Sequence, residues 1–136
     1  LRSKHILICD DYETIRTLLA EDLRALGASN ISTASSGNEA FDQIKTFLEV
    51  GLPVEFVITD LVMDNGSGID LTLKIRASAL PKINSLPILM VTSKADLKLV
   101  LDSAKAGVNN YIVKPWTQEA LGKRIVEVCQ KLKLLY

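Results

Sequence analysis

Five polar side chains stand at the ends of short apolar runs, and their types suit the transfer of a phosphoryl group. Asp10 and Asp11 follow the run HILIC, and Asp60 follows EFVIT. Thr92 ends PILMVT, and Lys114 ends NYIVK. If the three carboxylates lie together, their charges repel and raise their pKa values unless a cation neutralises them. Mg2+ suits such a site, because it accepts carboxylate oxygens and leaves positions for phosphate oxygens.

A carboxylate becomes a covalent phosphoacceptor when a cation and a lysine stabilise the charge on the oxygens of the transferred group. We therefore expect Asp60 to accept the phosphoryl group, with Lys114 and Mg2+ stabilising it. Structural roles compete with this interpretation: the aspartate pair or Thr92 could cap a helix, and Tyr111 could simply be a strand former. The joint placement of polar residues at four strand ends favours the functional interpretation.

Short apolar runs alternate with amphipathic stretches five times along the chain. The expected strands are residues 5–10, 30–34, 55–60, 87–92 and 110–114. Each is followed by apolar residues at helical spacing, namely Ile15, Leu18, Leu19, Leu23 and Leu26; Phe41, Ile44, Phe47 and Leu48; Ile69, Leu73 and Ala77; Leu97, Val100, Leu101 and Ala104; and Leu121, Ile125, Val128, Cys129 and Leu132. We expect the third helix to stop before Pro81 and a polar linker to follow it. Gly107 should end the fourth helix, and Thr117 should cap the last.

Five strand–helix units with continuous apolar strands predict an α/β fold with a parallel sheet covered by helices on both faces. The expected architecture is a flavodoxin-like (βα)5 three-layer sandwich with the strand order 2-1-3-4-5. A closed eight-unit barrel would need a much longer chain. In the predicted order the first and third strands are neighbours, so Asp10, Asp11 and Asp60 should meet at one edge of the sheet.

Composition narrows the class of protein. The 136 residues are 48% apolar, which is enough for a single compact domain over residues 1–136. Lysine plus arginine and aspartate plus glutamate both total 16, so the net charge gives no reason to expect nucleic acid or a membrane as partner. With no signal peptide and no run of roughly 20 apolar residues, we expect a cytoplasmic protein. Cys9 and Cys129 lack metal-ligand spacing and should be reduced core residues.

The motifs DD at Asp10 and Asp11, VITD at Asp60, VTS at Thr92 and YIVKP from Tyr111 resemble those of the response-regulator receiver family. The resemblance covers nearly the whole chain and is strongest to the CheY-like single-domain chemotaxis type. It implies that Asp60 and one or both of the paired aspartates bind Mg2+. The backbone carbonyl of Val62 would be a further ligand. The implied phosphoryl donor is a phosphohistidine on a sensor histidine kinase, or a small acyl phosphate.

The resemblance also implies how the signal leaves the site. Thr92 would move to hydrogen-bond the phosphoryl group, and Tyr111 would swing into the space that Thr92 leaves. This would remodel the face formed by the helix around 97–104, the strand 110–114 and the last helix, where a downstream protein would bind. A motor-switch protein is the target by analogy with chemotaxis. We expect a monomer with a cis Lys114–Pro115 bond, as family members commonly have.

Some residues depart from the family pattern. Family members often have Met-Pro and then Asp-Gly after the acceptor, whereas residues 63–68 read MDNGSG, with Asp64 in place of proline. This substitution puts the Mg2+ affinity and the rigidity of the loop in question. In the family, the positions of Val62 and Lys94 flank the path of hydrolytic water. Because valine cannot orient that water, we expect slow loss of the phosphoryl group. Trp116 stands where phenylalanine is common and should pack on the start of the last helix.

Proteins with other functions that share this kind of fold carry different residues at the strand ends. A haloacid dehalogenase-type phosphatase needs an Asp-x-Asp motif, but Tyr12 occupies its third position. A flavin-binding electron carrier needs a Ser/Thr/Gly-rich phosphate loop after the first strand, where this chain has DDYETIR. A receiver that serves only for docking would have lost the acceptor, the acid pair or the lysine. A phosphorelay intermediate, or a receiver from a larger regulator or hybrid kinase, stays open, since the chain begins with leucine and the parent protein could be longer.

Overall fold

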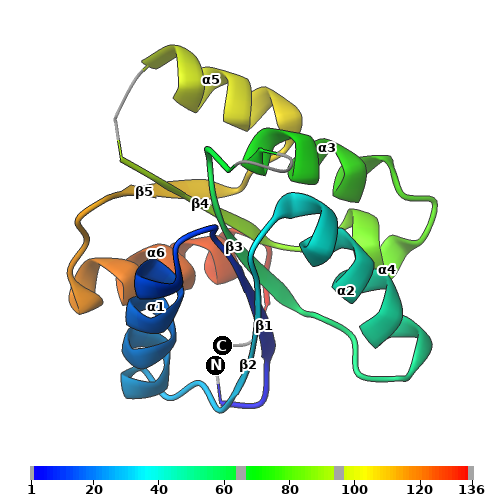
Figure 1. Ribbon diagram of the computed structural model, residues 1–136, viewed down its shortest axis with the longest axis horizontal. Helices are drawn as coiled ribbons and strands as arrows, with labels where there is room; N and C mark the ends of the chain where they lie inside the picture. Colours follow the sequence, from blue (N-terminus) through cyan, green and yellow to red (C-terminus); the bar gives the residue numbers. More distant parts are fainter. Residues whose placement is uncertain (1, 64–66, 94–96, 135–136) are drawn as a thin grey trace.

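The computed structural model describes residues 2–63, 67–93 and 97–134 (Figure 1). Strands and helices alternate along the chain, as the apolar pattern predicts. The elements are β1 (His5–Cys9), α1 (Glu13–Ala25), β2 (Asn30–Ala34), α2 (Gly37–Glu49), β3 (Phe56–Asp60), α3 (Gly68–Ala77), α4 (Pro81–Asn84), β4 (Ile88–Thr92), α5 (Leu97–Ala106), β5 (Asn110–Val113) and α6 (Gln118–Lys131).

The five strands form one parallel sheet in the order β2-β1-β3-β4-β5, which confirms the predicted flavodoxin-like topology. The register aligns the carboxyl ends of the strands. Cys9 lies opposite Thr59, so that Asp10 and Asp60 come next to each other at the same edge. Thr92 lies opposite Val113, which brings Lys114 to this edge as well. The site residues therefore meet because parallel strands end together.

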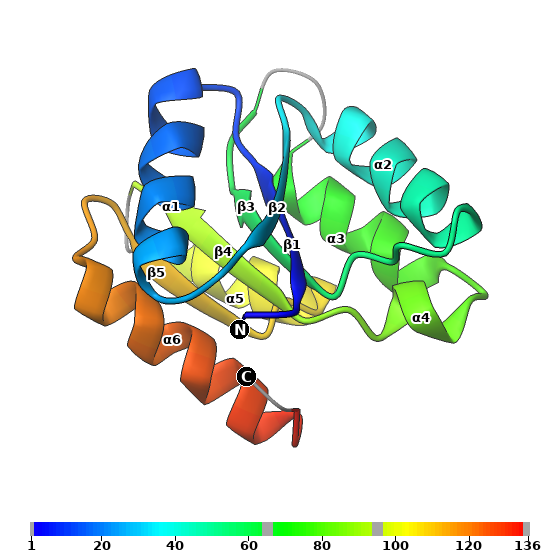
Figure 2. The ribbon, with the colours of Figure 1, turned by 90° about the horizontal axis from the view of Figure 1, so that it is seen from below.

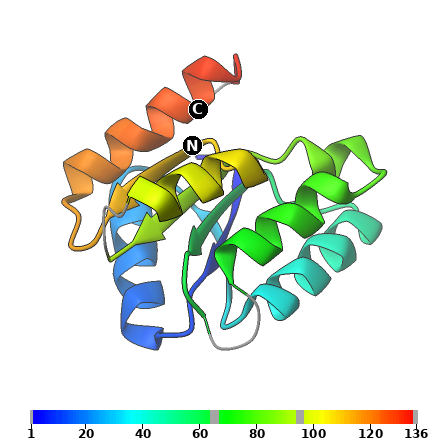
Figure 3. The same ribbon diagram turned by 90° about the horizontal axis from the view of Figure 1, so that it is seen from above.

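Helices cover both faces of the sheet. Figures 2 and 3 show α1 and α6 on one face and α2, α3 and α5 on the other. Alternate residues of β1 separate the two halves of the core: Ile6 and Ile8 pack with α1 and α6, whereas Leu7 and Cys9 pack with α2 and α3. Each such buried aliphatic side chain contributes about 1.5–3 kcal/mol to folding. The four residues of β1 after His5 are all apolar because both faces of the strand are buried.

One helix lies where the sequence predicts a polar linker. Residues Pro81–Asn84 form the short helix α4, with proline in its first turn and Ile83 buried beneath it. Proline favours this position because its φ is already helical and its missing N–H would have no partner there. The expected fourth and fifth helices are consequently α5 and α6.

The apolar stripe predicted for α3 is wrong. Its buried residues are Gly68, Leu71, Thr72 and Ile75, whereas Leu73 is 50% exposed and Ala77 is also exposed. Apolar residues occur on several sides of this short helix, so helical spacing alone does not decide which side faces the sheet. The buried hydroxyl of Thr72 donates a hydrogen bond of 2.7 Å to the carbonyl of Gly68, which removes the cost of burying it.

The predicted stripe of α5 is also partly wrong. Leu101 is 49% exposed and Ala104 is exposed, while Ser103 and Ala106 are buried. The hydroxyl of Ser103 donates to the carbonyl of Leu99 at 2.8 Å, so a serine can face the core. The end of the helix is as expected, since Gly107 adopts a φ of 112°.

The cysteines and most of the last helix follow the prediction, but Leu132, which is expected on the apolar face, is 37% exposed at the C-cap of α6. Cys9 and Cys129 are free and buried, and burial raises the pKa of the Cys9 thiol to about 12, which keeps it protonated and unreactive. The hydroxyl of Thr117 accepts a hydrogen bond of 3.0 Å from the backbone N–H of Ala120 and caps α6. Leu121, together with residues 125, 128 and 129, forms the buried face of α6.

Candidate functional site

Three carboxylates meet at the carboxyl ends of β1 and β3. Each of Asp10, Asp11 and Asp60 offers an oxygen within 4.8 Å of the others. Asp10 is completely buried, and Asp60 is 7% exposed. This arrangement confirms the prediction that the three carboxylates meet at one edge of the sheet. Such close like charges need a cation or protons to be stable.

Backbone contacts fix the position of Asp10. Its amide donates a hydrogen bond of 3.1 Å to the carbonyl of Ala34 in β2. Its carboxylate Oδ1 accepts a hydrogen bond of 2.8 Å from the amide of Tyr12. The guanidinium of Arg16 in α1 donates to the Asp10 carbonyl at 2.8 Å. These contacts hold the end of β1 and the start of α1 in one arrangement.

Lys114 bridges two of the acids. Its Nζ lies 3.2 Å from Oδ2 of Asp10 and 3.3 Å from Oδ1 of Asp60, and its side chain is 17% exposed. The Lys114 amide donates to the carbonyl of Thr92 at 2.7 Å, which fixes the backbone next to the site. The Lys114–Pro115 peptide bond is cis, as expected. One ammonium group thus contacts two carboxylates of the three-acid cluster.

An unpaired oxygen remains in the cluster. Among the described residues, Oδ1 of Asp11 is buried and has no hydrogen-bond partner. A buried acceptor without a partner costs about 1–3 kcal/mol, and more if it is charged. The donor set is made of hard carboxylate oxygens, and Lys114 is the one positive side chain in the described part of the chain that forms ion pairs with them. These residues fit a divalent cation with a preference for oxygen ligands, such as Mg2+.

The environment of Asp60 changes its acidity. Burial raises the pKa of Asp60, and the nearby charge of Asp10 raises it further. The ammonium of Lys114 and the amide of Leu61, which donates to Oδ1 at 2.8 Å, lower the pKa and partly oppose this effect. The hydroxyl of Thr59 donates to the Asp60 carbonyl at 3.0 Å. The result is a well-positioned carboxylate whose negative charge is not fully compensated by the protein.

Thr92 and Tyr111 border the same small cavity. Thr92 is 5% exposed at the end of β4, and Tyr111 is half-buried on β5. Both line a space of about 10 Å³ that is also bounded by Leu99 and Val100 of α5. Thr92 and Tyr111 therefore line the same cavity next to α5. Their coupled movement as a switch stays a prediction.

Gly68 packs closely against the backbone of Asp60, a role that the sequence pattern does not indicate. Its amide donates to the carbonyl of Leu61 at 2.9 Å. A Cβ atom at this position would overlap the backbone carbonyl of Asp60 and lie 2.8 Å from Sδ of Met90. Ser67 and Asp70 form a capping box that starts α3 at this glycine. A serine at position 67 is a residue type typical of a helix N-cap, so the start of α3 leaves a signal in the sequence. The close approach of Gly68 to Asp60 leaves no such signal, because it depends on the fold.

Two predictions concern residues in the loops that follow β3 and β4. Asp64, Asn65, Gly66 and Lys94 lie outside the described residues. The side chain of Val62 is 71% exposed beside the site. Metal binding through the Val62 carbonyl and the effect of Asp64 in place of proline stay predictions.

Trp116 packs as expected, and it also makes a contact that the sequence does not indicate. Its half-buried indole lies against the core formed with α1 and α6. The indole N–H donates a hydrogen bond of 2.7 Å to Oδ2 of Asp22 on α1. The segment after the cis bond is therefore tied to the first helix.

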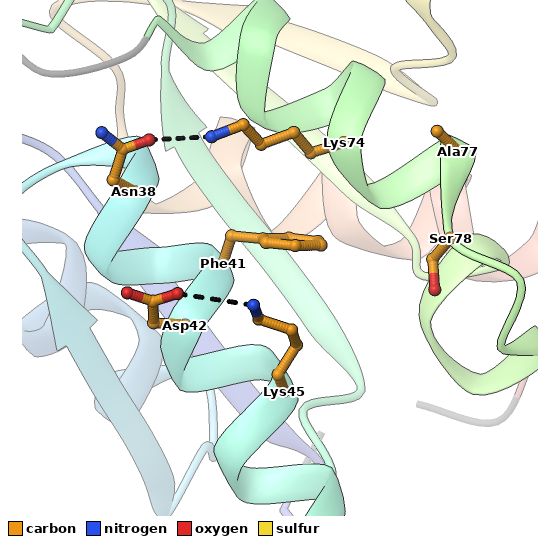
Figure 4. Close-up of a pocket in the computed structure, with 7 residues that line it drawn as sticks. All are labelled: Asn38, Phe41, Asp42, Lys45, Lys74, Ala77 and Ser78. Carbon is orange, nitrogen blue, oxygen red and sulfur yellow. Dashed lines mark hydrogen bonds and ion pairs between the residues drawn. The ribbon is translucent and has the colours of Figure 1, made fainter.

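A separate groove of about 620 Å³ lies between α2 and α3 (Figure 4). Its two lysines already have partners. Lys74 donates to Asn38 at 2.8 Å, and Lys45 lies 3.6 Å from Asp42 and 5.0 Å from the centre of the Phe41 ring. None of the three clustered aspartates lines this groove. The acid cluster at the strand ends is therefore not part of this groove.

Comparison with known proteins agrees with this site. A family model described as response regulator receiver domain matches residues 6–126. Chemotaxis protein CheY-3 of Vibrio cholerae is 36% identical over 131 residues, covering 96% of this chain and 95% of that protein. Chemotaxis protein CheY of Pseudomonas aeruginosa is 35% identical over 127 residues, covering 93% and 97%.

A solved structure supports the same fold. A chain of the CheX-CheY-BeF3-Mg+2 complex from Borrelia burgdorferi matches with a TM-score of 0.82 and 24% identity, covering 92% of this chain and 88% of that chain. Within the described part of the chain, no helix has the length and apolar character needed to span a bilayer. The matches favour a receiver over the phosphatase and electron-carrier alternatives. From its sequence, topology and clustered strand-end residues, the chain belongs to the response regulator receiver domain family.

Proposed function

We propose that this chain is a CheY-like signalling switch in which Asp60 accepts a phosphoryl group with the help of Mg2+. The observation that carries the proposal is the meeting of Asp10, Asp11 and Asp60, with Lys114 paired to two of them. In addition, one buried oxygen of Asp11 has no hydrogen-bond partner among the described residues. A site built only for stability would not leave a buried carboxylate oxygen without a donor.

Asp10, Asp11 and Asp60 would hold the ion, together with the backbone carbonyl of Val62. When bound, Mg2+ supplies positive charge that neutralises the carboxylates and the transferred phosphoryl oxygens. An oxygen of Asp60 forms the new bond to phosphorus, while the bond from phosphorus to the donor's imidazole nitrogen, or to the acyl oxygen of a small donor, breaks. Lys114 stabilises the charge that develops on the phosphoryl oxygens.

The resulting acyl phosphate changes which contacts are available near Thr92. Thr92 donates to the phosphoryl group, and Tyr111 moves into the cavity that the two residues share. The face formed by α5, β5 and α6 then favours a different arrangement, because only one arrangement gains the new contacts. A downstream protein bound to that face would read the phosphorylated state.

The relatives suggest the partners. The Vibrio and Pseudomonas relatives are named chemotaxis proteins, and the Borrelia structure of the same fold contains CheY with CheX, BeF3 and Mg2+. We place this switch in the cytoplasm as a monomeric receiver domain over residues 1–136, phosphorylated by a sensor histidine kinase. Its role lies in chemotaxis, and it acts on no external substrate. It binds neither nucleic acid nor membrane.

Intact-protein mass spectrometry tests this function directly. The protein is incubated with acetyl phosphate and Mg2+, alongside Asp60→Asn, a sample with EDTA, and Asp42→Asn as a control for the loss of an exposed carboxylate. We expect one phosphoryl adduct in the parent and in Asp42→Asn, and none in the other two samples. If no sample forms an adduct and beryllofluoride does not bind, the chain is a receiver that serves only for docking.

A further inference from the structure

Arg76 near the end of α3 makes five hydrogen bonds to neutral acceptors. Its Nε and Nη2 donate to the carbonyl of Gly107 at 3.0 Å and 2.8 Å. Its Nη1 donates to the carbonyls of Asn84 and Leu86 at 2.9 Å and 2.7 Å. Nη2 also donates to Oδ1 of Asn109 at 3.0 Å. One guanidinium therefore joins α3, the segment before β4, and the turn between α5 and β5.

This arginine is not part of an ion pair within the described residues. It is half-buried, and burial lowers the pKa of its guanidinium, which nevertheless stays charged. Hydrogen bonds from a charged donor are stronger than neutral ones, and the planar fork of arginine can serve several acceptors in fixed directions. The contacts of Arg76 thus hold backbone segments together.

The acceptors form a compact clamp around the end of α5. The side chain of Asn109 also accepts from the amide of Ile88 at 2.7 Å, and the Asn109 amide donates to the Ile88 carbonyl at 2.9 Å. A Cβ atom on Gly107 would lie 2.8 Å from Nε of Arg76, so the helix end approaches the arginine closely. The starts of β4 and β5 and the end of α5 are consequently tied to one point on α3.

The other end of α5 has a different environment. Leu99 and Val100, near its start, line the cavity that they share with Thr92 and Tyr111, and Ser103, one turn before Gly107, borders the same cavity. Figure 3 shows α5 beside α3, with its start toward the carboxyl end of β4 and its end toward the start of β5. The helix therefore has one end at the phosphoacceptor side and one end at the clamp.

We propose that Arg76 anchors the C-terminal end of α5, so that phosphorylation moves this helix about Gly107 and rearranges mainly its N-terminal half. This inference rests on the proposed function, because it describes how the change at Asp60 reaches the α5, β5 and α6 face. The clamp gives the switch a fixed point. When Thr92 moves, α5 then tilts about its fixed C-terminal end, and the hydrogen bonds of the helix are kept.

Hydrogen exchange measured by mass spectrometry tests the anchor, with beryllofluoride and Mg2+ as the phosphoryl mimic. In the parent, we expect the mimic to change exchange in 97–101 and to leave 104–110 unchanged. In Arg76→Lys, which keeps a charge but loses the fork, the amides of Val108 and Asn109 should exchange about tenfold faster or more without the mimic. The response to the mimic should then extend through 104–110. Lys74→Met on the same helix, whose lysine donates a hydrogen bond to Asn38 in α2, is the control and should behave as the parent.

Several outcomes would overturn the inference. One is an equal response to the mimic at both ends of α5 in the parent. A second is unchanged exchange of Val108 and Asn109 in Arg76→Lys. A third is an increase that is just as large for Leu7 and Ile8 in the interior strand β1, since this would mean general destabilisation. If the parent does not bind beryllofluoride but Arg76→Lys still loosens Val108 and Asn109, the proposed function is wrong and the anchor is retained.

Discussion

The ammonium group of Lys114 lies 3.3 Å from a carboxylate oxygen of Asp60, at the ends of two strands that are not neighbours in the sheet. The same nitrogen lies 3.2 Å from Asp10. Asp60 therefore has a cationic partner before any donor arrives. This geometry leads to predictions for the lysine, for the acceptor and for the cation.

Replacing Lys114 with methionine should slow phosphorylation by acetyl phosphate about 100-fold or more, because it removes a positive charge that stabilises the transferred group. The rate can be followed by the growth of the phosphoryl adduct in intact-mass spectra. Lys123→Met, at an exposed position of α6, is the control for loss of a lysine and should react at the parent rate. A Lys114→Met rate within about twofold of the parent would remove Lys114 from the mechanism.

Asp60→Asn should stabilise the protein at pH 7 without metal, by about 1 kcal/mol. Burial and Asp10 raise the pKa of Asp60 in the folded state above its value in the unfolded chain. The stability linked to protonated Asp60 is therefore fully present below the unfolded pKa and is lost as the pH rises through the folded pKa. At neutral pH the ionised carboxylate is destabilising, and asparagine removes this charge.

Urea unfolding of both proteins over a pH series tests this prediction. The advantage of Asp60→Asn should shrink as the pH falls toward the ordinary carboxyl pKa of 3.8, where the parent also becomes neutral at this position. If Asp60→Asn is less stable than the parent at pH 7, the prediction is wrong. The ion pair of Asp60 with Lys114 would then stabilise the fold by more than the burial of Asp60 and its repulsion from Asp10 destabilise it.

Mg2+ should raise the stability of the parent, by about 2.7 kcal/mol when its concentration is 100 times the dissociation constant. Asp11→Asn should lose most of this effect, because Asp11 contributes a buried oxygen that has no hydrogen-bond partner within residues 2–63, 67–93 and 97–134. Thermal unfolding with and without Mg2+ gives the comparison, and Asp42→Asn controls for the loss of an exposed acid. Equal stabilisation of all three proteins would mean that the ion binds elsewhere.

Val62→Asn should speed the loss of the phosphoryl group by about threefold or more, because an amide can orient the attacking water. Val62 is 71% exposed, so this change should have little effect on folding. The decay of the adduct after removal of acetyl phosphate can be measured by intact mass. Val62→Thr keeps the branched shape and serves as the control. An unchanged decay rate in Val62→Asn would contradict the expected role of this position.

The fold and the central residues of the site could be predicted because parallel strands leave a strong pattern. A strand buried on both faces reads as a short apolar run, and its last residue marks the edge of the sheet. Asp10, Asp60 and Lys114 each follow such a run directly, so their meeting follows from strand order alone.

Other features depend on contacts that sequence spacing does not encode. Leu73 and Leu71 are equally apolar, and only packing decides that Leu71 faces the sheet. Gly68 touches Asp60 through a turn of the chain, and Arg76 binds carbonyl groups that any residue type carries. Backbone acceptors leave no trace in the residue pattern, so the clamp around α5 required the structure.

Trapping the acyl phosphate with borohydride tests the central claim most directly. After incubation with acetyl phosphate and Mg2+, borohydride reduces a phosphorylated aspartate to homoserine, which peptide mass spectrometry locates. The account predicts homoserine at position 60 alone, and no homoserine when EDTA is present. Homoserine at Asp10 or Asp11, or an adduct in intact-mass spectra that leaves position 60 unchanged, would contradict the assignment of Asp60 as the phosphoacceptor.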